Sequence, residues 1–278
     1  MAKTSQPRVV VLALPNPLLS SLAAPLDVFG GLGTVTSRCT GEPEAPAFDL
    51  AVATLDGGPL RMNGGLQLTP PLRMADAGQP DLVIISGVLS FPGMEEALPP
   101  AIEWLAERHA RGAWLASICT GAFPLARTGL LDDRTATTHW AVVQRFREQH
   151  PAVQLQPWRM FTDEQTLFCS AGSTAGYDLC LHVVGRLMGR EAALDCARAL
   201  LVEPQRDSQR PFAVPDLPRG HHDVEIRAAQ RRIDADFGER LTIAHPAREA
   251  GLSPRTFERR FKAATGEPPV RCLQRVPV

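Results

Sequence analysis

The sequence predicts an α/β fold: a doubly wound, mostly parallel sheet flanked by helices, followed by a small all-α domain with a helix-turn-helix. Three observations predict it. Short apolar runs alternate with segments of helical spacing over the first 200 residues or so, a polar stretch rich in proline and arginine follows, and two short helix patterns joined by a turn come last. We therefore expect domains over residues 1–203 and 223–278, with a linker at 204–222.

The strands of the first domain are predicted from short apolar runs, which are typical of parallel strands buried on both faces. Two later runs are expected to form a hairpin, with Asp163-Glu164-Gln165 as its turn. The predicted strands are residues 8–14, 48–55, 81–86, 113–118, 153–155, 159–162 and 166–169.

The helices are predicted where apolar residues recur with a helical period between and after these runs. Alternation of strands and helices places helices on both faces of the sheet. The predicted helices are residues 20–29, 95–108, 120–128, 140–150, 174–188 and 192–201.

Composition narrows the class of protein. With 278 residues, 44% of them hydrophobic, the chain can bury one sizeable core and add a small second domain. It has no run of 18 apolar residues and no apolar stretch of the signal-peptide kind near its start, so we expect a cytoplasmic protein without a membrane segment. The six cysteines lack C-x-x-C spacing, which predicts free thiols and no metal or other cofactor.

The chemical signal of the first domain is Cys119. An apolar strand is expected to run into it, and a helix pattern begins directly behind it, with Gly121 permitting close packing. The free N–H groups and dipole of that helix would stabilise a thiolate and lower the pKa of the thiol, as in a nucleophile elbow. The alternative is that Cys119 is a small buried hydrophobic residue.

The segment around this cysteine resembles a known family. Residues 125–140, together with 22–29 and 173–179, are similar to the PfpI/ThiJ branch of the class I glutamine-amidotransferase-like superfamily. The resemblance implies that Cys119 and His139 face each other. Enzymes of this fold carry a carboxylate where this chain has Ser21, and often Gly-Gly in the oxyanion-hole segment where it has Ser86-Gly87-Val88.

A serine cannot replace the carboxylate in proton transfer at neutral pH, so we expect no catalysis. Three roles remain open for the site: a pocket that binds an effector, a pocket that responds to oxidation, or a vestige kept only by packing. The residues assigned to this elbow are Cys119, His139, Thr120, Gly87 and Ser21.

The second domain is predicted from helix start and stop signals. Thr242 is the expected N-cap of the first helix, Gly251 supplies the positive φ that ends it, and Ser253-Pro254 begins the second helix as N-cap and N1. One side of the pair would form a small core, and the other could enter a DNA major groove. The core residues are Ala247, Ala250, Leu252, Phe257 and Phe261, and the expected DNA-facing residues are Ser253, Arg255, Thr256, Arg259 and Arg260.

The distribution of charged residues favours a DNA-binding helix pair over an ordinary amphipathic pair with a solvated face. Residues 223–278 hold 11 Lys+Arg against 8 Asp+Glu, a net charge of +3, whereas residues 1–222 hold 18 against 22, a net charge of −4. The basic excess therefore lies in the domain where DNA would bind.

The stretch 252–262, with Thr265-Gly266 and Pro268-Pro269 after it, resembles the first helix-turn-helix of the AraC/XylS regulators. The two resemblances together identify the chain with the GlxA-like regulators, in which the amidotransferase-like fold is joined to an AraC-type domain. They imply a transcriptional regulator that binds promoter DNA, with a first domain that binds a small-molecule effector and dimerises.

The AraC/XylS family carries two such motifs, and the second is absent here, which implies a truncated DNA-binding domain. Two alternatives stay open. The chain could be a ligand-sensing protein without effective DNA binding, or a cysteine-dependent hydrolase or hydratase of the PfpI/ThiJ or isonitrile hydratase type.

Overall fold

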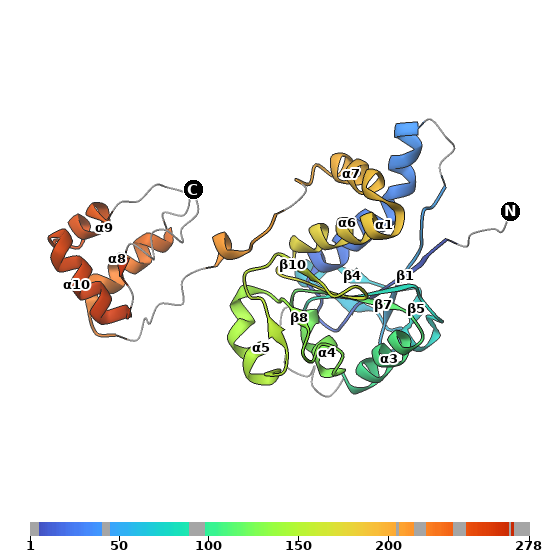
Figure 1. The fold of residues 1–278 in the computed structure, drawn as a ribbon, viewed down its shortest axis with the longest axis horizontal. Helices are drawn as coiled ribbons and strands as arrows, with labels where there is room; N and C mark the ends of the chain where they lie inside the picture. The colour runs from blue at the N-terminus through green and yellow to red at the C-terminus, as the bar shows by residue number, and fades with distance from the viewer. Residues whose placement is uncertain are drawn as a thin grey trace. The chain divides into compact units, whose positions relative to one another are not determined.

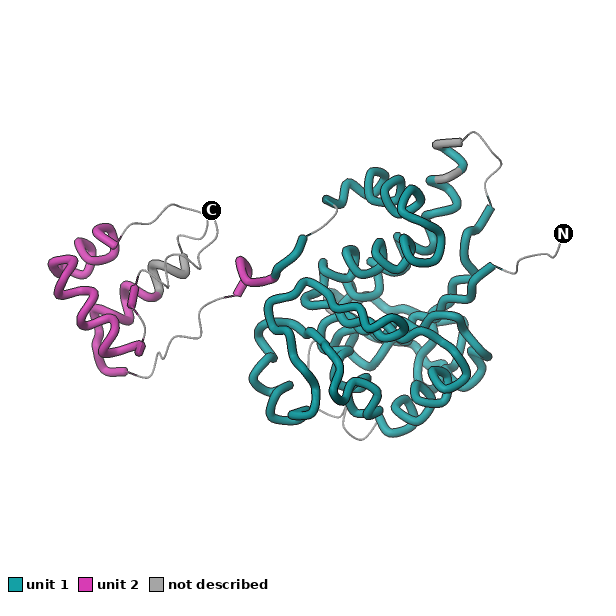
Figure 2. The backbone as a smooth tube through the Cα atoms, in the orientation of Figure 1, with its two compact units in different colours: residues 1–208 teal, residues 209–278 magenta. Residues whose placement is uncertain are grey.

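The structure is a computed structural model, and it describes residues 6–40, 45–88, 98–203, 206–213, 221–235, 243–266 and 268–269. The chain forms two compact units, Met1–Ser208 and Gln209–Val278 (Figure 2). Their boundary falls inside the segment 204–222 that the sequence predicts as linker. The predicted cap Thr242, the linker residues 204–205 and 214–220, Cys272 and the side chain of Cys39 lie outside the description.

The first unit is built on a seven-stranded sheet with the order β10-β11-β7-β6-β1-β2-β5. Every neighbouring pair is parallel except β10 and β11, which form the predicted hairpin. The mostly parallel doubly wound sheet is therefore confirmed. The strands are β1 (Arg8–Leu12), β2 (Asp49–Thr54), β5 (Leu72–Arg73), β6 (Leu82–Ile85), β7 (Trp114–Ile118), β10 (Phe161–Asp163) and β11 (Leu167–Ser170).

Helices cover both faces of this sheet (Figure 1). Both faces of the sheet are apolar, because successive residues of a strand point to opposite faces. In β1, Val9 packs with one group of helices and Val10 with the other. One face carries α1 (Leu19–Thr40), α6 (Ala175–Met188) and α7 (Arg190–Ala199), and the other carries α3 (Pro99–Ala110), α4 (Ala122–Arg127) and α5 (Val143–Gln149).

Two of the predicted elements have other bounds or partners than the sequence-based expectation gives them. Helix α1 continues to Thr40, well past the predicted end at residue 29, because Leu32 is buried against the sheet and this packing outweighs the weak helix propensity of a stretch rich in glycine and threonine. Residues Gln154–Leu155 form β9, which pairs in parallel with β8 (Thr135–Ala136) outside the main sheet.

Short elements complete the first unit. The strands β3 (Leu60–Arg61) and β4 (Gln67–Leu68) form a separate antiparallel pair. The single turns of 3₁₀ helix in the two units are η1 (Asn63–Gly65), η2 (Met74–Asp76), η3 (Cys119–Gly121), η4 (Trp140–Val142) and η5 (Arg210–Phe212).

The second unit contains α8 (Val224–Ala235), α9 (Ala244–Glu249) and α10 (Pro254–Thr265). Gly251 has φ +67° after α9, and the Ser253 hydroxyl accepts a hydrogen bond from the Thr256 N–H at 3.3 Å, so the turn and the cap of α10 form at the expected residues. Of the predicted core, Ala250 and Leu252 are only partly buried. The fully buried core is Ile226, Ala229, Ala247, Phe257 and Phe261.

The residues that the structure describes lack two features. None of their helices is both long and apolar enough to cross a bilayer. They also contain no group of three or more His, Cys, Asp or Glu side chains placed to hold a metal ion.

Candidate functional site

Cys119 lies at a sharp bend between β7 and the turn that leads into α4. Its φ is +59°, in the left-handed region, where a residue other than glycine stores about 1–3 kcal/mol of backbone strain. A strained residue between a central parallel strand and a helix is the geometry of a nucleophile elbow.

Two glycines allow the chain to close around this bend. A Cβ atom on Gly121 would lie 2.6 Å from the carbonyl oxygen of Ile85, and one on Gly87 would lie 2.9 Å from the Cβ of Cys119. Neither position has room for a side chain. The predicted residue Gly87 is therefore in direct contact with Cys119.

The backbone amides beside the thiol are already hydrogen-bonded. The Gly87 N–H donates to the Ser21 hydroxyl at 3.1 Å, and the Val88 N–H donates to the Thr120 hydroxyl at 2.7 Å. Ser21 in turn donates to the Leu18 carbonyl at 2.6 Å and is fully buried. An oxyanion hole requires N–H groups that are free to bind a developing negative charge. These two amides are not free, because side-chain hydroxyls occupy them.

His139 lies near the elbow but is not bonded to the thiol. The Thr138 hydroxyl donates to the Cys119 carbonyl at 2.9 Å and so holds the two segments together. The Nδ1 atom of His139 accepts from the Ala141 N–H at 3.1 Å, which puts the proton of the neutral ring on Nε2. Burial lowers the pKa of His139, so the ring is neutral at pH 7.

This tautomer leaves His139 without a free lone pair to accept the Cys119 proton. Within the part of the chain that is described, no hydrogen bond joins the ring to Cys119 Sγ. The predicted elbow residues are thus gathered in one place, but they are not connected as a thiol and its base.

The pKa of Cys119 corrects the expectation of an acidic thiol. Burial raises it to about 11, although the N–H and hydroxyl of Thr120 act in the opposite direction. Burial likewise raises the pKa of Cys169 and Cys196 to about 11, and it raises that of Cys180. All four are free thiols. The sequence pattern located the helix N-terminus correctly but gave no measure of desolvation, which here is the larger effect.

Slow alkylation of Cys119 is the first testable consequence. With a pKa of about 11, roughly one thiol in 10⁴ is ionised at pH 7. The labelling rate by iodoacetamide should therefore rise about tenfold per pH unit from pH 7 to 10, because only the thiolate reacts. Timed labelling and peptide mapping by mass spectrometry measure this rate, and the chain unfolded in urea gives the reference. Rapid labelling of Cys119 at pH 6.5 in the folded protein would contradict a thiol that is protonated at that pH.

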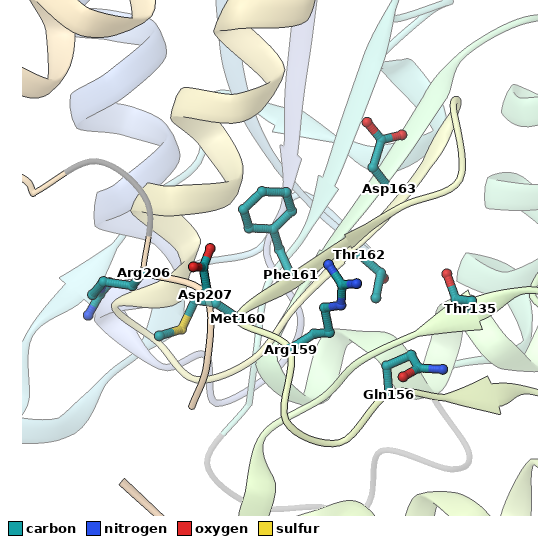
Figure 3. Close-up of a pocket in the computed structure, with 9 residues that line it drawn as sticks. All are labelled: Thr135, Gln156, Arg159, Met160, Phe161, Thr162, Asp163, Arg206 and Asp207. Atoms are coloured by element: carbon teal, nitrogen blue, oxygen red, sulfur yellow. The ribbon is translucent and has the colours of Figure 1, made fainter. Parts of the chain in front are cut away.

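A cavity of about 370 Å³ lies at the β10 edge of the sheet (Figure 3). The side chains of Arg159 and Asp207 line it and have no ion-pair partner among the residues described. Sequence reasoning missed this cavity, since its walls come from segments with no common periodicity. Its lining is Thr135, Gln156, Arg159, Met160, Phe161, Thr162, Asp163, Arg206 and Asp207.

One wall of the cavity is a segment that we call the strap, residues 206–208. Arg206 binds the carboxylate of Asp178 at 2.5 Å and the Thr174 carbonyl at 2.8 Å, and the Asp178 side chain is only 2% exposed. The Asp207 carbonyl accepts from the Met160 N–H at 3.2 Å. The strap is thus held against α6 and the start of β10, and the second unit begins directly after it.

In the second unit, the predicted DNA-facing residues separate into two groups. Ser253 and Thr256 hydrogen-bond to each other as the cap of α10, and Arg260 binds acidic side chains of the same unit. Arg255 and Arg259 lie one helical turn apart and are exposed, and neither has a hydrogen-bond or ion-pair partner in the described chain.

The first unit is thus an α/β domain with a doubly wound, mostly parallel sheet and a cysteine at positive φ directly behind a central strand. The chain belongs to the DJ-1/PfpI family, whose model matches residues 37–186. It is similar to the HTH-type transcriptional regulator GbdR of Pseudomonas aeruginosa, with 29% identity over 75% of this chain and 56% of that protein. It is also similar to the isonitrile hydratase of Pseudomonas putida, with 29% identity over 49% of this chain and 58% of that protein.

Among solved structures, an AraC family transcriptional regulator from Pseudomonas putida shares the fold, with a TM-score of 0.56 and 24% identity. That match covers 70% of this chain and 99% of the other. The family match over residues 37–186 confirms the resemblance of the first domain to the PfpI/ThiJ branch. The chain spans little more than half the length of the curated relatives named above.

Proposed function

We propose that the protein is a transcriptional regulator in which the DJ-1/PfpI domain senses a small molecule and α10 of the second unit binds promoter DNA. The observation that carries this proposal is the surface of α10, where Arg255 and Arg259 are exposed and have no ion-pair partner among the residues that the structure describes. Similarity to a regulator such as GbdR supports it. An arginine fork can bind the edge of a guanine or a phosphate, and both ligands are available in a major groove.

Removing both arginines should abolish most of the DNA affinity. Each bidentate base contact is worth about 1–3 kcal/mol, so Arg255→Ala with Arg259→Ala should weaken binding at least about 30-fold. Fluorescence anisotropy with the DNA upstream of the gene measures this. The matched control is Arg111→Ala with Arg198→Ala, which removes the same charge from the surface of the first unit. Equal affinities of the two double variants would refute α10 as the reader.

We further propose that the protein acts as a homodimer. Each chain presents a single helix of this kind among its described residues, and two copies would place two such helices on DNA, one helical turn apart. Light scattering of the complex should give two chains per duplex, and a complex of one chain would contradict the dimer.

The effector is proposed to bind in the cavity beside the strap, because a ligand there would touch the segment that leads into the second unit. A thermal-shift screen of metabolites should find a compound that raises the melting temperature of the first unit. The shift should be lost in Arg159→Ala and kept in Arg134→Ala, which removes an exposed arginine outside the cavity. A shift that survives Arg159→Ala would place the effector elsewhere.

No catalytic step is assigned to Cys119. The thiol is protonated, the neighbouring amides are occupied, and His139 has no lone pair for the thiol proton. Hydrolysis of an amide or hydration of an isonitrile that disappears in Cys119→Ala would overturn this assignment.

A further inference from the structure

The start of α8 is joined to α10 by a cluster of charged side chains, which we call the Asp223 clamp: Asp223, Glu225 and Arg260. The Nε atom of Arg260 donates to one oxygen of Asp223 at 2.8 Å, and Nη2 donates to the other at 2.7 Å. Nη2 also donates to Glu225 at 2.8 Å. The guanidinium therefore binds Asp223 through two parallel hydrogen bonds, the arrangement that fixes relative orientation most strongly.

Asp223 has a second bond that ties the clamp to the backbone. Its Oδ1 atom accepts from the Ile226 N–H at 3.1 Å and so caps α8. The side chain thus links the first turn of α8 to the seventh residue of α10. The hydrogen bonds from Arg260 hold the pKa of Asp223 below its usual range, so the carboxylate is ionised at neutral pH.

The small core of this unit leaves the orientation of α10 dependent on such a link. Phe257 and Phe261 are the fully buried apolar residues of α10, and they lie on the face opposite Arg255 and Arg259. Apolar packing is not directional, whereas a bidentate ion pair fixes an angle. Both partners are partly exposed, at 31% for Arg260 and 20% for Asp223, so their contribution to stability is small.

We propose that Asp223 is a positioning residue for DNA recognition, which holds α10 at the angle that Arg255 and Arg259 need, and that Arg260 serves this clamp and does not contact DNA. The inference rests on the proposed function of α10 as the DNA reader. It assigns Arg260 a different role from the one its sequence position predicts.

The two roles of Arg260 predict opposite effects of one substitution. If Arg260 bound DNA, Asp223 would compete for its guanidinium, and Asp223→Ala would tighten binding by freeing it. In the clamp, Asp223→Ala lets α10 turn away and weakens binding. Once Asp223 is gone, removing Arg260 as well should change little, because the two residues act as a unit.

The experiment is a double-mutant cycle on the full chain, measured by anisotropy with the upstream duplex at four salt concentrations. Asp223→Ala, Arg260→Ala and the double variant should each bind about tenfold more weakly than the wild-type chain. The slope of log affinity against log salt should stay unchanged, since loss of a phosphate contact would lower it by about one. Asp223→Arg combined with Arg260→Asp should restore part of the affinity that either reversal alone removes.

The outcomes separate this inference from the proposed function. Binding that is lost in the Arg255 and Arg259 double variant but unchanged or tighter in Asp223→Ala overturns the clamp alone. A smaller slope of log affinity against log salt in Arg260→Ala also overturns the clamp, because it would indicate a lost phosphate contact. A wild-type chain that does not bind the duplex overturns both. Thermal unfolding of each variant shows whether the second unit is folded at the assay temperature, and Asp223→Asn, which keeps the cap of α8, should lose affinity without unfolding.

Discussion

Replacing Phe261 with alanine should unfold most of the second unit and abolish DNA binding. The ring is fully buried and packs against Phe257 with 5.5 Å between ring centroids, in a core that has five buried apolar residues among those described. Truncating a buried phenylalanine costs about 3–5 kcal/mol, as much as the whole stability of a unit of this size. Amide spectra by NMR should lose the dispersed signals of α8, α9 and α10, while those of the first unit remain.

Lys262→Ala is the matched control, because Lys262 is the next residue of α10 and is exposed. It should change stability by no more than about 0.5 kcal/mol. Retention of dispersed signals and of wild-type affinity in Phe261→Ala would show that the second unit does not depend on this core.

Replacing Gly121 with alanine should destabilise the first unit by about 3 kcal/mol. The added Cβ would lie 2.6 Å from the Ile85 carbonyl oxygen and 2.9 Å from that of Ser86, and both are backbone atoms at the end of a central strand. Because no side chain can rotate away, the strand and the elbow must move apart. The melting temperature of this unit should fall by about 6–12 °C, which scanning calorimetry measures.

Gly185→Ala is the control for glycine replacement in general. Gly185 lies inside α6, and the nearest atom to an added Cβ is the Cβ of Ala193 at an ordinary 3.6 Å. Alanine there should stabilise the helix by about 0.5–1 kcal/mol. A similar loss of stability in both variants would contradict the role given to the contact at Gly121.

The fold could be predicted from the sequence because its signals are local. The apolar runs of β1, β6 and β7 and the periodic faces of α6 and α10 are complete within about a dozen residues each. The errors arose where distant packing decides the structure. Leu32 extends α1 by its contact with the sheet, and Gln154–Leu155 pair with Thr135–Ala136, which no local pattern shows.

The position of the elbow could be predicted in the same way, from an apolar strand, a cysteine and a helix pattern in direct succession. Its chemical state could not, because the deciding hydrogen bonds join residues far apart in the chain. Ser21 and Gly87 are 66 residues apart, and Val88 and Thr120 are 32 apart. Desolvation of Cys119 is likewise a property of the assembled core.

The hydroxyl-capped amides beside Cys119 also bear on how this protein can evolve. A single Ser21→Glu change would supply a carboxylate of the kind that enzymes of this fold carry, but it would place that group at a fully buried position. The Val88 amide would remain occupied by Thr120, and His139 would keep its tautomer. Acquiring a catalytic site of that kind would therefore cost stability before all of its parts were in place.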